Sequence, residues 1–397
     1  MSAKPPVKDW TTDFDHTDPR WVNDPFPLWD QLRQRCPMAH SERFEDGAYF
    51  PSRYAEVREI SYDTEHFSSR RVIVREKKLN PPMPSPPITS DPPEHRPARM
   101  PLLPAFNLKA IERLTPRTRE LCGRLIERFI AEGKCDAATD YAQHIPTRVI
   151  AHMLGVNEND GDRFRTWIKM ALEEGIHDAS RTVQAIGEMS AYFKAELARR
   201  GSAKGEDLIS FMRDLRQDGQ QIPEDKLIGT LRLLLIAGID TTWSAIGASL
   251  WHLATHDEDR RRLAAEPALM DTAVEELLRA YAPVTMAREV VKEVSIGGCP
   301  MKPGSMVLLS FPAANRDPAV FPDADKVLLD RQENRHAAFG LGIHRCIGSN
   351  LARMELRVAL EEWLKRIPEF RLQNPAAVKW SEGTVRGPRQ MAVVFGR

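Results

Sequence analysis

The sequence predicts a mainly α-helical protein with small β-sheets, on three observations. Apolar residues follow helical spacing through most of the chain between residues 96 and 251, and two further helical runs follow, the second directly after Cys346. Short alternating runs with glycine turns lie between them and at the C-terminal end. No repeat period or low-complexity tail interrupts the chain, so we expect one cooperative domain over residues 1–397.

The N-terminal 90 residues are rich in proline and aromatic side chains. The segment DPFPLWDQLRQRCP predicts a short helix ended by Pro37, and GAYFPSRYAEVREIS predicts a strand that leads into another helix. The next stretch, LNPPMPSPPITSDPPEHRP, places eight prolines in 19 residues. Such a stretch fits either a linker or an ordered loop over a site.

The central and C-terminal parts alternate long helices with a minor β portion. The segment AIERLTPRTRELCGRLIERFIAEG predicts a helix that stops at Gly133, and DTAVEELLRAYAP predicts a helix closed by Pro283. The most apolar run, LIGTLRLLLIAGIDTTWSAIGASLWHLA, contains Arg232 and Asp240, which favours a buried helix over a membrane span. EVSIGGCPMKPGSMVLLSF is typical of a small sheet, and GPRQMAVVFGR predicts a returning strand.

Composition excludes several classes of function. Lys and Arg number 56, as do Asp and Glu, so the net charge is zero and gives no electrostatic case for a nucleic-acid partner. The N-terminus lacks a secretory pattern, and we expect a soluble, cytoplasmic protein that does not enter a membrane. Five cysteines without a C-x-x-C pair speak against a disulfide framework or a closed zinc site.

Cys346 lies in the segment HAAFGLGIHRCIGSN and allows three ordinary interpretations: a buried structural cysteine, a nucleophile or a metal ligand. A nucleophile paired with His344 is weak, because residues two apart on a helix do not face each other. A zinc site would need more ligands than the segment offers. A buried cysteine leaves the glycines at 340, 342 and 348 unexplained.

The residues after Cys346 predict a helix that is apolar on two sides and therefore deeply buried. The two apolar stripes are Ile347, Leu351, Met354 and Val358, and Leu356, Leu360, Trp363 and Leu364. The N-terminal end of a helix stabilises an anion, which favours a thiolate at Cys346. A thiolate with glycines around it suits iron in a porphyrin.

The ten residues from Phe339 to Gly348 resemble, at every fixed position, the haem-binding loop of the cytochrome P450 family. The resemblance implies a roughly triangular, mostly α fold with haem b between two long helices and Cys346 as the iron ligand. It also implies cofactor-binding roles for four further loop residues, Phe339, Gly340, Gly342 and Gly348.

A second segment, AGIDTT at 237–242, resembles the family's oxygen-activating helix motif. Independently of the family, Gly238 and Thr241 are expected to open the helix locally, because Thr241 can bond a backbone carbonyl. Asp240 would be costly inside an apolar helix unless hydrated or paired. The resemblance implies that Asp240 and Thr241 are catalytic and deliver protons.

The resemblance also assigns residues to the two haem carboxylates and to the support of the cysteine loop. The carboxylate partners it implies are His95, Arg99, Arg288 and His344, with His336 as a possible further contact. The implied structural cluster is Glu276, Arg279 and Arg331.

The implied activity is that of a monooxygenase that uses O2 on a small, largely apolar molecule, by hydroxylation or O-dealkylation. A peroxide-driven peroxygenase and a non-catalytic haem sensor remain alternatives. Positional candidates for contact with substrate are Leu233, Ile236, Ala237, Val284 and Met286. The basic residues of the loop at 69–90 leave open an acidic substrate.

The chain after Cys346 leaves no room for a flavin domain and lacks an iron–sulfur cysteine run. We therefore expect electrons from a separate ferredoxin and its NAD(P)H-dependent reductase. Arg345, Arg353 and Arg357 are candidates for a basic docking patch.

Overall fold

The computed structural model describes residues 5–76, 79, 83–217 and 219–396. Its α-helices are α1 Pro19–Asn23, α2 Phe26–Arg35, α3 Tyr54–Tyr62, α4 His95–Arg99, α5 Leu108–Glu112, α6 Thr115–Glu127, α7 His144–Leu154, α8 Gly161–Lys169, α9 Gly175–His177, α10 Ala179–Arg200, α11 Leu208–Asp214, α12 Glu224–Thr255, α13 Asp257–Ala265, α14 Met270–Ala280, α15 Phe311–Ala314 and α16 Ser349–Arg366. Its strands are β1 Met38–Ser41, β2 Ala48–Pro51, β3 Phe67–Ser68, β4 Lys134–Asp136, β5 Arg216–Gln217, β6 Gln220–Gln221, β7 Thr285–Val290, β8 Val294–Ile296, β9 Cys299–Met301, β10 Met306–Ser310, β11 Phe370–Leu372, β12 Lys379–Trp380, β13 Pro388–Gln390 and β14 Ala392–Phe395. The predicted mainly α fold with small sheets is confirmed.

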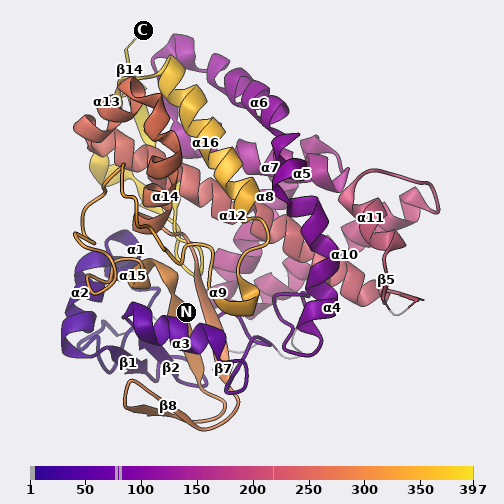
Figure 1. Cartoon of the computed structure of the whole chain (residues 1–397), viewed down its shortest axis with the longest axis vertical. Coiled ribbons are helices and arrows are strands. Elements are labelled where there is room, and N and C mark those ends of the chain that lie inside the picture. The colour runs from indigo at the N-terminus through magenta and orange to yellow at the C-terminus, as the bar shows by residue number, and fades with distance from the viewer. Residues whose placement is uncertain (1–4, 77–78, 80–82, 218, 397) are drawn as a thin grey trace.

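The helices form the larger part of the molecule, and the main sheet lies at one corner (Figure 1). Within the described residues, the largest sheet has the strand order β1-β2-β10-β7-β3. β10 is antiparallel to β7, with Val307 opposite Arg288. Because alternate residues of a strand share a face, Met286 and Arg288 project to the same side of β7, and both line the cavity described below.

α12 is the long central helix of the molecule and packs against α7, α10 and α16 (Figure 1). It has no proline between its ends, and Glu224 and Asp225 in its first turn complement the helix dipole. By length and composition α12 alone among the described helices could cross a membrane, but 72% of its apolar window is buried inside the protein. It is apolar on nearly every side because it is a core helix.

The predicted continuous helix over residues 110–133 is wrong. α5 ends at Glu112, α6 begins at Thr115, and a separate 3₁₀ turn at Ile130–Glu132 precedes Gly133. Pro116 causes the first break, because it lacks an N–H and its ring clashes with the carbonyl four residues earlier. Gly133 ends the region as predicted, in a left-handed conformation with φ of 69°.

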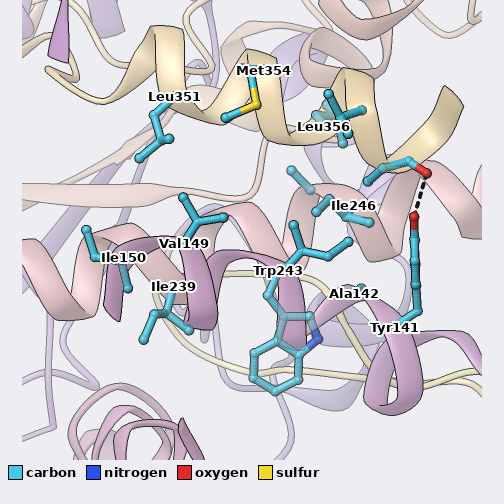
Figure 2. Close-up of a cluster of buried hydrophobic side chains, with 14 of the residues drawn as sticks. Tyr141, Ala142, Val149, Ile150, Ile239, Trp243, Ile246, Leu351, Met354 and Leu356 are labelled. Carbon is cyan, nitrogen blue, oxygen red and sulfur yellow. Dashed lines mark hydrogen bonds between the residues drawn. The ribbon is translucent and has the colours of Figure 1, made fainter. Parts of the chain in front are cut away.

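α16 confirms the prediction of a helix that is buried on two sides. Leu351 and Met354 point from α16 toward Val149 of α7 and Ile246 of α12 (Figure 2). On another side of α16, the backbone carbonyl of Ala359 accepts a hydrogen bond of 2.8 Å from the Tyr141 hydroxyl. Neighbours on both sides fix the position of the helix start, and with it the cysteine loop.

Glu355 on α16 is a fully buried carboxyl group, and neither side-chain oxygen has a hydrogen-bond partner among the described residues. Burial raises its pKa well above the usual value. The carboxyl is therefore protonated in the folded chain at pH values where the unfolded chain is ionised. The folded chain is therefore most stable below the pKa of the unfolded glutamate, and this stability is lost as the pH rises from that value toward the folded pKa.

We expect Glu355→Gln to remove this loss of stability. The free energy of unfolding of the variant relative to the parent should rise with pH, by on the order of 1 kcal/mol for each pH unit above the pKa of an unfolded glutamate. Denaturant titrations at about pH 5 and about pH 8 measure the difference. A difference that does not change with pH would show that Glu355 is ionised when folded.

Candidate active site

A cavity of about 400 Å³ lies between α12, the segment before α16, strand β7 and the loop that begins at Ser69. Cys346, Gly340 and Gly348 line it from the cysteine loop, and Gly238 and Thr241 line it from α12. The five residues predicted to contact substrate all line this cavity: Leu233, Ile236, Ala237, Val284 and Met286. Both sequence motifs therefore contribute residues to one mainly apolar cavity.

Backbone geometry around Cys346 explains the glycines of the loop. Gly340 and Gly342 have φ of 71° and 66°, in the left-handed region that other residues avoid. A Cβ on Gly342 would also lie 2.2 Å from the backbone oxygen of Ser61 on α3. The Cys346 N–H donates to the Phe339 carbonyl at 2.8 Å, which closes the loop beneath the cavity.

The Cys346 side chain is exposed to the cavity but lies deep within the protein. Burial raises the pKa of its thiol, whereas a backbone hydrogen bond from Gly348 and the charges of Arg99, Arg345 and Arg353 act to lower it. Cys346 lies three residues before the start of α16, whose N-terminal end adds a positive potential. A cation bound at the sulfur would complete the stabilisation of a thiolate.

Positive and polar groups that a haem carboxylate would need are present on the same cavity. Arg288 is buried without an ion-pair partner among the described residues, and burial lowers its pKa to about 10. The His344 ring lies 4.5 Å from the His95 ring, and its Nε2 lies 2.8 Å from Ser69 Oγ. Arg99 donates a hydrogen bond to the Arg345 carbonyl.

His95 carries the clearest sign of a missing acceptor. Its ring is buried, and its Nε2 has no hydrogen-bond partner within the described part of the chain. A buried nitrogen without a partner is costly unless a ligand supplies one. Together with Arg99, Arg288 and His344, this atom fits a group that is flat, apolar and carries two carboxylates.

The expectation that His336 adds to this group is wrong. Its Nε2 lies 3.1 Å from Glu275 Oε2, its Nδ1 accepts from the Ala338 N–H, and it does not line the cavity. Glu275 also binds Arg353, at 2.6 and 2.7 Å. Burial acts to raise the pKa of Glu275, but hydrogen bonds from Arg353 and His336 outweigh it and lower the pKa to about 2.

The same pairing weakens the predicted basic docking patch. Arg353 forms an ion pair with Glu275, which neutralises its charge, and Arg357 Nη1 lies 3.8 Å from Asp271 Oδ1. Arg345 remains exposed beside the cysteine. Sequence alone could not foresee this, because Arg353 and Glu275 are 78 residues apart.

Glu276, Arg279 and Arg331 meet in a buried cluster behind the cysteine loop. Both Glu276 and Arg279 are fully buried and form two hydrogen bonds of 2.8 Å. Arg331 Nε donates to Glu276 Oε2 at 3.0 Å. Arg279 also donates to three backbone carbonyls, those of Asn315, Ala324 and Lys326. The cluster therefore anchors the chain that leads into the loop.

On α12, Thr241 Oγ1 donates to the Ala237 carbonyl at 2.8 Å, as the sequence predicted. α12 is continuous from Glu224 to Thr255 around this hydrogen bond. Gly238 leaves no room for a side chain. A Cβ there would lie 2.9 Å from Ile150 Cγ1 of α7. The glycine allows α7 and α12 to pack closely beside the cavity.

Asp240 turns away from the cavity and is almost fully buried. Arg389 of β13 supplies the required partner, with Nη2 at 2.6 Å from Asp240 Oδ1. The same guanidinium binds Glu173 at 2.6 Å and the Ser244 hydroxyl at 3.0 Å. Burial raises the pKa of Asp240 to about 6; Arg389 opposes this increase and Glu173 adds to it.

Arg389 and Glu173 are the site residues that sequence reasoning missed. Arg389 is 149 residues from Asp240 and lies in a tail identified only as a strand. Because burying an unpaired carboxylate costs free energy, the presence of Asp240 in an apolar helix indicated that some cationic side chain must lie beside it. It could not indicate which of the many arginines supplies the charge.

We expect substitutions around Asp240 to shift the pH dependence of turnover in opposite directions. Arg389→Gln removes the favourable charge and should raise the apparent pKa above about 6, by roughly one unit or more. Glu173→Gln removes a like charge and should lower it. Profiles of kcat against pH measure both shifts, with Arg389→Lys as the charge-preserving control. Identical profiles in all variants would contradict a role for Asp240 in turnover.

Fold and site together fit a haem-thiolate protein, because the exposed sulfur of Cys346 faces a mainly apolar cavity that α12 also lines. Comparison with known proteins agrees. A model of the cytochrome P450 family matches residues 161–381. The mycinamicin IV hydroxylase/epoxidase of Micromonospora griseorubida is 36% identical over 360 residues, which cover 89% of this chain and 90% of the relative.

Two more comparisons extend the similarity over nearly the whole chain. The vitamin D(3) 25-hydroxylase of Pseudonocardia autotrophica is 32% identical and covers 95% of this chain and 94% of its own length. The solved structure of the cytochrome P450 PksS of Bacillus subtilis 168 superposes with a TM-score of 0.88 at 27% identity, covering 97% of this chain and 100% of that one. The chain belongs to the cytochrome P450 family. It is a P450 monooxygenase of the soluble bacterial type, and the family's cofactor is haem b.

Proposed function

We propose that this enzyme inserts one oxygen atom of O2 into a small, largely apolar organic molecule, by hydroxylation or O-dealkylation. The observation that supports the proposal best is the position of Cys346 and Thr241 on one mainly apolar cavity. Bacterial relatives include a mycinamicin IV hydroxylase/epoxidase and a cytochrome P450 monooxygenase, PikC. We further propose that the chain acts as one domain in the cytoplasm, with electrons from a ferredoxin and its NAD(P)H-dependent reductase.

Each side chain of the site has a task in this proposal. Cys346 would hold the haem iron through its sulfur, and Arg99, Arg288, His95 and His344 would bind the haem carboxylates. The bound haem supplies the chemistry of oxygen activation. The glycines of the cysteine loop leave room for a flat group to approach.

We assign the handling of protons to two groups on α12. Asp240, with a pKa of about 6, can gain and release a proton near neutral pH. Thr241 follows it in the chain, lines the cavity and carries a hydroxyl that can pass a proton on. Arg389 positions the Asp240 carboxylate and stabilises its ionised form.

The apolar wall performs the selection of substrate. Leu233, Ile236 and Ala237 project from α12, and Val284 and Met286 come from the chain around β7. Apolar walls exclude water and hold an apolar substrate by burial of its surface. Its orientation then depends on polar groups at the cavity edge.

A reconstituted mixture of the haem-loaded enzyme, a ferredoxin, its reductase and NADH tests the proposal. We expect oxygenated product in step with NADH consumption and O2 uptake. Turnover driven by hydrogen peroxide and undiminished in Thr241→Ala would instead identify a peroxygenase. Haem binding without product over a broad panel of small molecules would identify a haem sensor.

A further inference from the structure

The cavity wall carries more positive charge than haem carboxylates require. Among the described residues, five arginines line it: Arg70, Arg71, Arg75, Arg99 and Arg288. Arg99 and Arg288 belong to the proposed haem carboxylate group. The other three lie on the loop at 69–90, of which residues 77–78 and 80–82 fall outside the described part.

In two of these three arginines the positive charge is neutralised by a carboxylate or exposed to solvent. Arg71 binds Asp46 and lies 3.7 Å from Glu289 Oε1. The Arg70 side chain is 78% exposed, with Asp91 at 3.8 Å. Neither one presents an unbalanced charge inside the cavity.

Arg75 differs, because it has no carboxylate within ion-pair distance anywhere in the described chain. Its Nη1 donates to the Gly175 carbonyl at 2.5 Å, and its Nη2 lies 3.4 Å from the Ala171 carbonyl. Burial alone lowers the pKa of Arg75, to about 10, and no acidic side chain raises it. At neutral pH the group therefore stays charged, partly buried and unneutralised on the cavity wall.

Acidic residues near these carbonyls are committed to other cations. Glu173 binds Arg389 at 2.6 Å, and Glu174 binds Arg181 at 2.7 Å. Glu76, next to Arg75 in sequence, lies 3.1 Å from His177 Nδ1. None of them is free to neutralise Arg75.

We propose that Arg75 binds a carboxylate of the substrate, so that the natural substrate is an apolar molecule with one carboxylate group. This inference rests on the proposed monooxygenase function and names its substrate class. A guanidinium has five N–H donors in a planar fork that matches a carboxylate, and the two carbonyls use only part of it. These carbonyls also hold the guanidinium in place and disfavour a dianion such as a phosphate ester.

The arrangement separates the anchor from the apolar walls. Arg75 lies against the π-helical turn Met170–Glu174 and α9, whereas Leu233, Ile236 and Ala237 form the α12 wall. A bound acid would place its carboxylate at Arg75 and its apolar body along α12. Acids with alkyl chains of different length would therefore bring different carbon atoms near Thr241.

Matched pairs of ligands test the inference. The probes are phenylalkanoic acids of increasing chain length and the corresponding primary amides, which have nearly the same shape without the charge. The haem content and the spectrum of the reduced carbon monoxide complex are recorded first for each variant. Binding is then measured by isothermal calorimetry and by the change in haem absorbance.

We expect the parent enzyme to bind its best acid at least about tenfold more tightly than the amide. Arg75→Gln should bring this ratio close to one while the affinity for the amide changes little, and Arg75→Lys should keep most of the preference. Arg70→Gln, on the same loop but exposed, is the matched control and should leave the ratio unchanged.

Equal binding of acids and amides by the parent enzyme would overturn the inference. An equal loss of affinity for both ligands in Arg75→Gln would also overturn it, since Arg75 would then only tie the loop to Ala171 and Gly175. Absence of the haem-thiolate spectrum in the parent would instead refute the proposed function. Calorimetry reads the ratio of acid to amide without relying on that spectrum, so the two failures are distinguishable.

Discussion

Cys346→Ser is expected to abolish the long-wavelength Soret band of the carbon monoxide complex, which is characteristic of thiolate-ligated haem. A serine hydroxyl does not ionise near neutral pH, so it cannot supply the electron-rich ligand that favours cleavage of the O–O bond. Turnover in the reconstituted mixture should fall by at least about a thousandfold, equivalent to about 4 kcal/mol in the activation barrier. Reduced-protein spectra and initial rates provide the measurement.

Cys299→Ser is the matched control for this prediction. Cys299 begins β9 and does not line the cavity, so both the spectrum and the rate should stay near those of the parent enzyme. Retention of the thiolate band by Cys346→Ser would refute the assignment of Cys346 as the iron ligand. Loss of the band in both variants would point to general damage.

Arg279→Met is expected to lower the free energy of unfolding by about 3–5 kcal/mol, because it leaves Glu276 buried with only part of its compensation. Glu276 would keep the hydrogen bonds from Arg331 Nε, the Leu328 N–H and Asn334 Nδ2, but its two bonds to Arg279 would be lost. Denaturant unfolding measures the loss. Haem content should fall as well, because the cluster anchors the chain before the cysteine loop.

Lys326→Met tests whether burial explains the size of this effect. Lys326 forms an ion pair with Asp323 at 2.9 Å, but both side chains are more than half exposed. An exposed pair contributes about 0–1 kcal/mol, so the change should be small. The double variant Glu276→Gln/Arg279→Met should lose less than the sum of the two single variants, since the two groups share one interaction. Strict additivity would contradict a coupled buried pair.

Local patterns were sufficient to predict the helical class, the burial of α12 and α16 and the cysteine loop. In each case the information lies within a few turns of chain: apolar residues on several sides of a helix, or glycines that alone tolerate positive φ at 340 and 342. The break between α5 and α6 also has a local cause, Pro116. The prediction of one continuous helix there was wrong because it followed the apolar spacing and not the proline.

Partners that are distant in sequence could not be predicted in the same way. The pairing of Asp240 with Arg389, of Arg353 with Glu275, and of His336 with the same Glu275 all join separate elements. An apolar helix reveals its own burial, whereas a charged residue shows only that it needs a counter-charge. Chain topology decides which one it finds.

The sequence by itself determined the fold class, the position of Cys346 before a buried helix, and the motifs at 237–242 and 339–348. Only the tertiary structure decided which charges are neutralised. Asp240 pairs with Arg389 and Arg353 pairs with Glu275, whereas Arg75 has no carboxylate partner among the described residues. The physical reason is that helix burial and backbone conformation follow from near neighbours along the chain. Ion pairing and desolvation depend on which distant segments the fold brings within a few ångströms.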